Sequence, residues 1–151
     1  MQIVKGRAIK PPRVALYGKD GVGKTTFAAG ADRPICLPTE EGADEVGVDR
    51  FPLIEDFPAF LKALAQVARE DHDYGTVVVD SLTCLERLIW ADVSKEYGVG
   101  NIEEVLKGFG KGYLIAIDRW RRVLAGLDIC RARGMAVVLV AHSQIRRFDS
   151  P

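Results

Sequence analysis

Eight residues, GKDGVGKT at 18–25, place the strongest constraint on how this chain folds and what it binds. They match the pattern GxxxxGK[ST] at every fixed position. They lie between a short apolar run at 13–17, which predicts a buried strand, and residues 27–31, which can continue as a helix. Glycines at 18, 21 and 23 allow backbone N–H groups to converge on a phosphate, and the helix N-terminus adds partial positive charge. The pattern therefore predicts a phosphate-binding loop, called the P-loop below.

The P-loop assigns a role to several side chains. Lys24 is predicted to bridge the β- and γ-phosphates of a nucleotide, and the Thr25 hydroxyl to bind Mg²⁺. Thr26 could reach the α-phosphate. The predicted nucleotide contacts are Gly18, Lys19, Asp20, Gly21, Val22, Gly23, Lys24, Thr25 and Thr26.

A second metal ligand is predicted at the end of another strand. Residues 76–79 are all β-branched and lead into Asp80, which is typical of a strand buried on both faces. A carboxylate in such a place is costly unless a cation or hydrogen bonds meet it. Asp80 is therefore interpreted as the Walker B carboxylate. The alternative, that Asp80 caps a helix opening at Ser81 and Leu82, stays open, and both roles could coexist.

The fold class follows from strands that alternate with helices. Besides 13–17 and 76–79, strands are predicted at 34–37 and 135–141, with helices over 57–68 after a cap at Asp56, over 82–93, and from Tyr113 to Gly134. Residues 98–112 hold five glycines, so at least part of this segment is loop. The pattern predicts one α/β domain over residues 1–151, with a mostly parallel sheet flanked by helices. Since such sheets usually have five or more strands, the four counted here suggest truncation at the C-terminal end.

Composition limits the class of protein and its partners. The 151 residues are 48% hydrophobic and 28% charged, as in soluble globular proteins, and 21 basic residues balance 21 acidic ones. A globally basic surface for nucleic acid is therefore excluded. No apolar run or signal-peptide core suggests a membrane partner. Three scattered cysteines predict a reduced, cytoplasmic protein, with Cys84 and Cys130 as small core residues.

The group that orients the attacking water is less constrained. Position 81 is serine, where many P-loop ATPases place a catalytic glutamate, so the base must come from elsewhere. Glu40 and Glu41 follow the second strand, at the edge where open α/β sheets bind ligands. Gln144, beyond the last strand, is a candidate γ-phosphate sensor, with His142 beside it. No NKxD motif for guanine occurs, which favours ATP over GTP.

Four segments carry a resemblance to known proteins. YGKDGVGKTTFAAG, PTEEGAD, GFGKGY and AHSQIRRF resemble the RecA-like ATP-binding proteins of phages and prophages, a family that includes single-strand annealing ATPases. The resemblance spans residues 13–151. It implies a catalytic glutamate at Glu40, with Glu41 as the register alternative, and a sensor glutamine at Gln144, after a strand between the P-loop and Walker B strands. It also implies Mg²⁺-dependent ATP hydrolysis, single-stranded DNA binding and a homo-oligomer.

DNA contacts are predicted in two segments. Lys107, Phe109 and Lys111, before Tyr113, and Arg146, Arg147 and Phe148 interleave cations with aromatic rings, as single-strand binding requires. Solvated loop charge is the alternative explanation for such runs.

Two other functions stay open. Lys19 makes the loop resemble that of ParA/MinD-type partitioning ATPases, which switch by dimerising, although Asp20 replaces a glycine of that pattern. A nucleotide-binding fragment without turnover is the third possibility.

Overall fold

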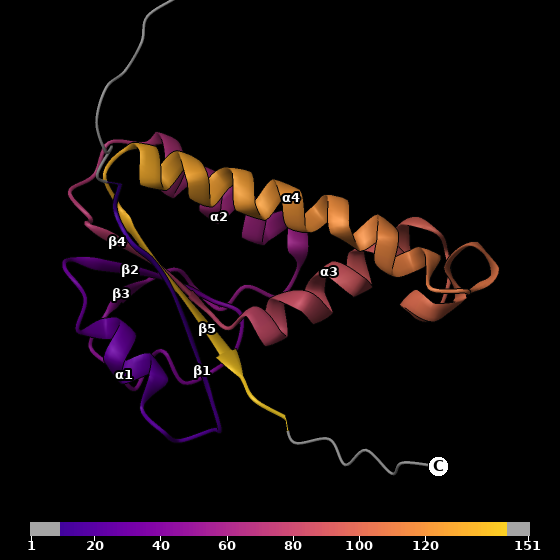
Figure 1. The fold of residues 1–151 in the computed structure, drawn as a ribbon, viewed down its shortest axis with the longest axis horizontal. Helices are drawn as coiled ribbons and strands as arrows, with labels where there is room; N and C mark the ends of the chain where they lie inside the picture. The colour runs from indigo at the N-terminus through magenta and orange to yellow at the C-terminus, as the bar shows by residue number, and fades with distance from the viewer. Residues whose placement is uncertain (1–9, 145–151) are drawn as a thin grey trace, which may run out of the picture.

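The computed structural model describes residues 10–144 of the chain (Figure 1). Its centre is a sheet of five parallel strands in the order β1-β5-β4-β2-β3. The strands are β1 Arg13–Gly18, β2 Pro34–Pro38, β3 Asp49–Arg50, β4 Thr76–Asp80 and β5 Ala136–His142. The predicted α/β class and parallel sheet are confirmed.

The count of four strands was one too low. β3 has two exposed residues, Asp49 and Arg50, which pair with Ile35 and Cys36 of β2. A strand this short has no run of apolar residues by which a sequence pattern could reveal it. Its backbone hydrogen bonds to β2 define it instead.

Helices connect the strands close to where the sequence predicts them. They are α1 Lys24–Ala29, α2 Phe57–Arg69, α3 Leu82–Glu96 and α4 Lys111–Ala132, with a 3₁₀ helix, η1, at Ile102–Lys107. The Asp56 carboxylate caps α2 by accepting from the Ala59 N–H at 2.7 Å. α4 begins two residues before the predicted start at Tyr113, and the rest of the glycine-rich segment is η1 and loop.

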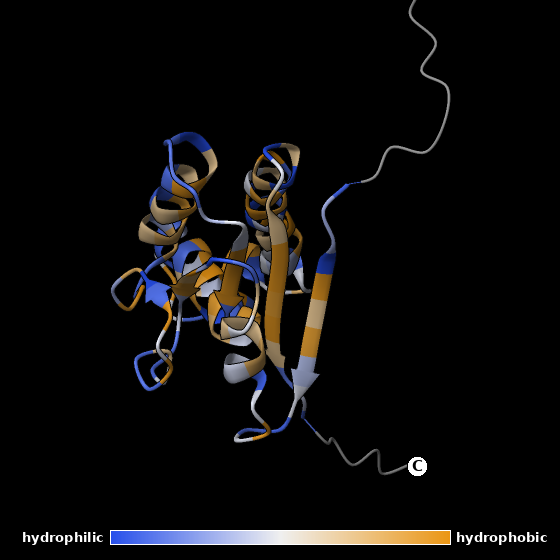
Figure 2. Ribbon diagram, turned by 90° about the vertical axis from the view of Figure 1, so that its left-hand side faces the viewer, coloured by the Kyte–Doolittle hydropathy of each residue, from blue (hydrophilic) through white to orange (hydrophobic). Residues whose placement is uncertain are grey.

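The helices lie in two layers against the sheet (Figure 1). The larger core, including Val77 and Val79 of β4, packs against α2, α3 and α4. Val78 points to the other face, where it joins Ala28 of α1 in a smaller cluster. Figure 2 shows that the central strands are largely hydrophobic. Burial on both faces explains why β4 reads as a continuous apolar run.

The topology gathers the ends of four strands at one edge of the sheet. Gly18 at the end of β1 is in register with His142 of β5, and Pro38 at the end of β2 with Asp80 of β4. Ligands of open α/β sheets bind at this carboxyl edge. The P-loop, Asp80, and the residues after β2 and β5 therefore meet there. Within residues 10–144, no helix has the length and apolar character needed to cross a membrane.

Candidate functional site

The P-loop wraps around the ammonium group of Lys24. Lys24 Nζ donates to the carbonyl oxygens of Gly18 at 3.1 Å and Lys19 at 2.8 Å. Gly21 and Gly23 have φ angles of 74° and 86°, a region that favours glycine. The loop conformation thus explains these two glycines, and it holds a cation beside the start of α1.

Thr25 and Asp80 lie in contact beneath the P-loop. The Thr25 hydroxyl donates to Asp80 Oδ2 at 2.7 Å. Asp80 is 2% exposed, and its second oxygen, Oδ1, receives no hydrogen bond from the described residues. Burial raises the pKa of Asp80, and the Thr25 hydrogen bond opposes that shift only in part.

This pair fits the ligand set of a magnesium ion. Mg²⁺ takes oxygen ligands and keeps several waters. A buried carboxylate oxygen without a donor, next to a hydroxyl, is the chemistry that such a hydrated ion satisfies. Thr25 and Asp80 are therefore the residues of this chain that could hold Mg²⁺.

The alternative role of Asp80 as a helix cap is wrong. Ser81, which follows Asp80 through a cis peptide bond, is the N-cap of α3, and its Oγ accepts from the Cys84 N–H at 3.3 Å. Since Ser81 meets the free backbone donor of the helix, the Asp80 carboxylate is left to face Thr25.

Glu40 lies in a cluster of three hydrogen-bond donors. Ser81 Oγ lies 2.8 Å and Cys84 Sγ 3.0 Å from Glu40 Oε2, and His142 Nε2 lies 2.7 Å from Oε1. Burial alone would raise the pKa of Glu40, but the hydrogen bonds from Cys84, His142 and Ser81 together lower it below its ordinary value. Glu40 is therefore held as a carboxylate at the edge of the site.

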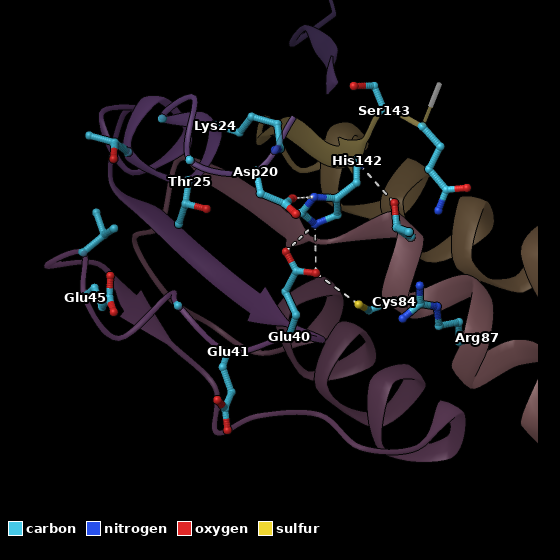
Figure 3. A pocket seen from close by; sticks show the side chains of 17 residues that line it. Asp20, Lys24, Thr25, Glu40, Glu41, Glu45, Cys84, Arg87, His142 and Ser143 are labelled. Carbon is cyan, nitrogen blue, oxygen red and sulfur yellow. Dashed lines mark hydrogen bonds and ion pairs between the residues drawn. The ribbon is translucent and has the colours of Figure 1, made fainter. Parts of the chain in front are cut away.

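Glu41 lies differently from its neighbour. It is exposed, and Figure 3 shows its side chain pointing away from the cluster around Glu40. Of the two glutamates that the sequence left open, Glu40 is the one that the fold brings beside His142.

One cavity of about 650 Å³ is lined by Lys24, Thr25, Glu40, Glu41 and His142. Gln144 and Thr26 also line it, so the start of α1 and the segment after β5 share one space. β5 lies between β1 and β4, which places Gln144 after the strand that the resemblance implied. Within the P-loop, Val22 is 63% exposed, and Lys19 contributes its carbonyl oxygen to Lys24.

Sequence reasoning missed several side chains of this cavity, among them Cys84 and Arg87. Cys84, expected in the core, is half-buried and donates to Glu40, whereas Cys130 is fully buried as predicted. Arg87, one turn further along α3, also lines the cavity. The available signal was helical spacing, because Ser81, Cys84 and Arg87 are three positions apart and residues at that spacing face the same side of a helix.

The predicted DNA contacts lie away from this cavity. Lys107, Phe109 and Lys111 surround the end of η1 and the start of α4, beyond the far end of α3 (Figure 1). α3 has 15 residues, which corresponds to about 22 Å of helix. Arg146, Arg147 and Phe148 lie outside the described residues.

The comparison with protein families agrees with this fold. A family model described as an AAA domain matches residues 10–151. The chain belongs to this AAA-domain family. Nucleotide binding is the property that the family and the P-loop have in common.

One curated relative comes from a prophage. The chain is 22% identical over 144 residues to the SPbeta prophage-derived uncharacterized protein YorG of Bacillus subtilis (strain 168). The match covers 93% of this chain and 43% of that protein, so the chain spans less than half the length of this relative.

Proposed function

We propose that this AAA domain binds ATP with Mg²⁺ and hydrolyses it. The observation that carries the proposal is the contact between Thr25 and Asp80 under the P-loop, with an ionised Glu40 in the same cavity. This arrangement joins a phosphate site, a metal site and a carboxylate that can orient water.

In this mechanism the chain acts by positioning and electrostatics. The P-loop amides and Lys24 stabilise the charge that develops on the transferred phosphoryl group. Glu40 accepts a hydrogen bond from the attacking water and orients it toward the phosphorus. Thr25 and Asp80 would hold Mg²⁺, which would supply further charge neutralisation. Gln144 is the proposed contact to the γ-phosphate.

Steady-state hydrolysis of Mg²⁺·ATP tests the proposal. We expect Lys24→Ala to lower turnover by at least about 10²-fold, the effect of removing one electrostatic contact to a transition state. A surface variant, Asp118→Asn, is the control, because Asp118 is exposed on α4. Turnover retained in Lys24→Ala would remove the P-loop from the mechanism.

We further propose that hydrolysis is coupled to single-stranded DNA, in recombination of the phage annealing type. The prophage origin of the relative supports a phage context. The loop before α4 supports the DNA contact: Phe109 is 96% exposed, and it lies between Lys107 and Lys111. A cationic loop with an exposed ring suits backbone contact and base stacking.

The backbone of this loop is strained in a way that suits a binding site. Leu106, Lys107 and Phe109 have φ angles of 51°, 66° and 58°, although none is a glycine. Such residues cost free energy and cluster at ligand-binding positions. The strain therefore favours a functional loop over one that merely solvates charge.

DNA binding is tested with an oligonucleotide of mixed sequence and the variant Phe109→Ala. We expect binding to weaken about five- to a hundredfold, since stacking on one aromatic ring is worth ~1–3 kcal/mol per base. Ile129→Ala is the control, because it likewise removes an exposed apolar side chain, in this case from α4. Unchanged binding in Phe109→Ala, or hydrolysis indifferent to DNA, would contradict the DNA role and leave the ATPase proposal standing.

We also propose, from the resemblance, that the chain works as a homo-oligomer in the cytoplasm. Light scattering with and without Mg²⁺·ATP tests assembly, and a monomer under both conditions would contradict it.

A further inference from the structure

His142 joins two carboxylates from separate parts of the chain. Its Nε2 lies 2.7 Å and 2.9 Å from the two oxygens of Glu40, and its Nδ1 contacts Asp20 Oδ1. Asp20 belongs to the P-loop, Glu40 follows β2, and His142 ends β5. Figure 3 shows the imidazole ring between the two acidic side chains. We call these three residues the histidine bridge.

The middle of the histidine bridge is fixed by the sheet. The backbone N–H of His142 donates to Thr83 Oγ1 at 3.0 Å. The backbone N–H of the next residue, Ser143, donates to the Gly18 carbonyl at 3.0 Å. The His142 side chain is 22% exposed. The ring is therefore held between α3 and the start of the P-loop.

The two ends of the bridge are held unequally. Glu40 also accepts hydrogen bonds from Ser81 and Cys84. Asp20 has an 88% exposed side chain, and among the described residues His142 is its one ion-pair partner. A competing anion therefore displaces Asp20 from the ring more easily than it displaces Glu40.

The P-loop brings such an anion to Asp20. Asp20 lines the same cavity as Lys24 and Thr25, where the phosphates of a nucleotide bind in the proposed function. The terminal phosphate of a triphosphate is negatively charged and competes with the Asp20 carboxylate for the place beside His142 Nδ1, which makes no hydrogen bond to the described residues. It also repels Asp20. A diphosphate lacks this terminal group and leaves the contact in place.

We propose that the histidine bridge distinguishes nucleoside triphosphate from diphosphate: a terminal phosphate replaces Asp20 on His142, while His142 keeps its hold on Glu40. His142 is thus a positioning residue for Glu40, and Asp20 occupies its other nitrogen until the triphosphate arrives. This inference rests on the proposed binding of ATP at the P-loop. It adds that Asp20 and His142 set the preference for triphosphate over diphosphate.

Equilibrium binding of a non-hydrolysable ATP analogue and of ADP, each with Mg²⁺, tests the bridge without depending on turnover. Asp20→Asn removes the competing carboxylate, so we expect the preference for the triphosphate over ADP to rise about fivefold, the scale of one exposed charge contact. His142→Ala removes the group that receives the terminal phosphate, so the same preference falls. Asp118→Asn removes an equal charge from an exposed position on α4, so it leaves the preference for the triphosphate unchanged.

Nuclear magnetic resonance of imidazole nitrogens gives a second measurement on the unaltered ring. The chain has two histidines, and the ring of His72 hydrogen-bonds to the Val67 carbonyl oxygen, outside the P-loop cavity. We expect the ATP analogue to shift the His142 Nδ1 signal, with ADP leaving it in place and His72 as an internal reference. Equal shifts with both nucleotides would overturn the bridge.

The outcomes separate this inference from the function beneath it. If neither nucleotide binds, the ATP-binding proposal fails, and the bridge fails with it. If both bind and their ratio is the same in the wild-type chain and Asp20→Asn, the bridge alone is wrong.

Discussion

The substitution Asp80→Asn separates what the proposed metal site costs in folding stability from what it contributes to ligand binding. In the nucleotide-free chain, Asp80 is buried, its Oδ2 accepts from Thr25, and its Oδ1 receives no hydrogen bond from the described residues. Asparagine keeps an oxygen for Thr25 and removes the buried charge. We expect the variant chain without nucleotide to be more stable than the wild type.

The size of this effect follows from the unpaired oxygen. A buried polar atom without a partner costs about 1–3 kcal/mol. The asparagine amide is itself a polar group in a buried position, so part of the cost remains. We therefore expect a gain at the low end of that range, near ~1 kcal/mol, which raises Tm by about 2–4 °C in a chain of this size.

The ligand response should change in the opposite direction. A ligand present at a hundred times its Kd stabilises a folded chain by ~2.7 kcal/mol. Asp80→Asn lacks a carboxylate for Mg²⁺, so the stabilisation by Mg²⁺·ATP falls while that by metal-free ATP is little changed.

Thermal unfolding of both chains, with and without nucleotide and Mg²⁺, measures both effects. Asp118→Asn controls for the loss of a charge at an exposed site, where shifts stay within about 0.5 kcal/mol. The reasoning is refuted if Asp80→Asn is destabilised without nucleotide, or if Mg²⁺·ATP stabilises it as strongly as the wild type.

Three further predictions follow from named contacts. Glu40→Gln should lower ATP turnover at least about 10²-fold, whereas Glu41→Gln should change it less than threefold. Equal losses of turnover in the two variants would contradict the role of Glu40 as the residue that orients the attacking water. Because the folded-state pKa of Glu40 is lowered, its ionised form contributes stability above its ordinary pKa, and this contribution is lost as pH falls through the lowered value. In chemical denaturation the wild type should exceed Glu40→Gln in stability most at neutral pH and least in acid, and a gap that widens in acid would contradict the sign. Gly112→Ala should lower the free energy of unfolding by about 1–3 kcal/mol, because a Cβ there collides with the carbonyl oxygen of Ile102. Gly47→Ala is the control, because that glycine has open space around it. Equal unfolding midpoints for the two variants would count against the packing of η1 on α4.

Much of the fold could be predicted because its signals are local. A run of β-branched residues ending in Asp80 reports burial on both faces wherever the strand lies in the sheet. Gly21 and Gly23 reflect backbone angles within one loop. β3 escaped prediction because two exposed residues carry no pattern, and its strand exists through pairing with β2.

The candidate site divides in the same way. The sequence by itself determined the phosphate loop and its lysine, because spacing within eight residues sets that geometry. Only the tertiary structure placed Glu40 beside His142, gave the cap of α3 to Ser81, and turned Cys84 toward the cavity. The histidine bridge joins residues separated by up to 122 positions, Asp20 and His142, and it exists because the strand order places the end of β5 beside the P-loop. Sequence spacing describes neighbours along the chain, whereas the pairing of parallel strands decides which distant ends meet.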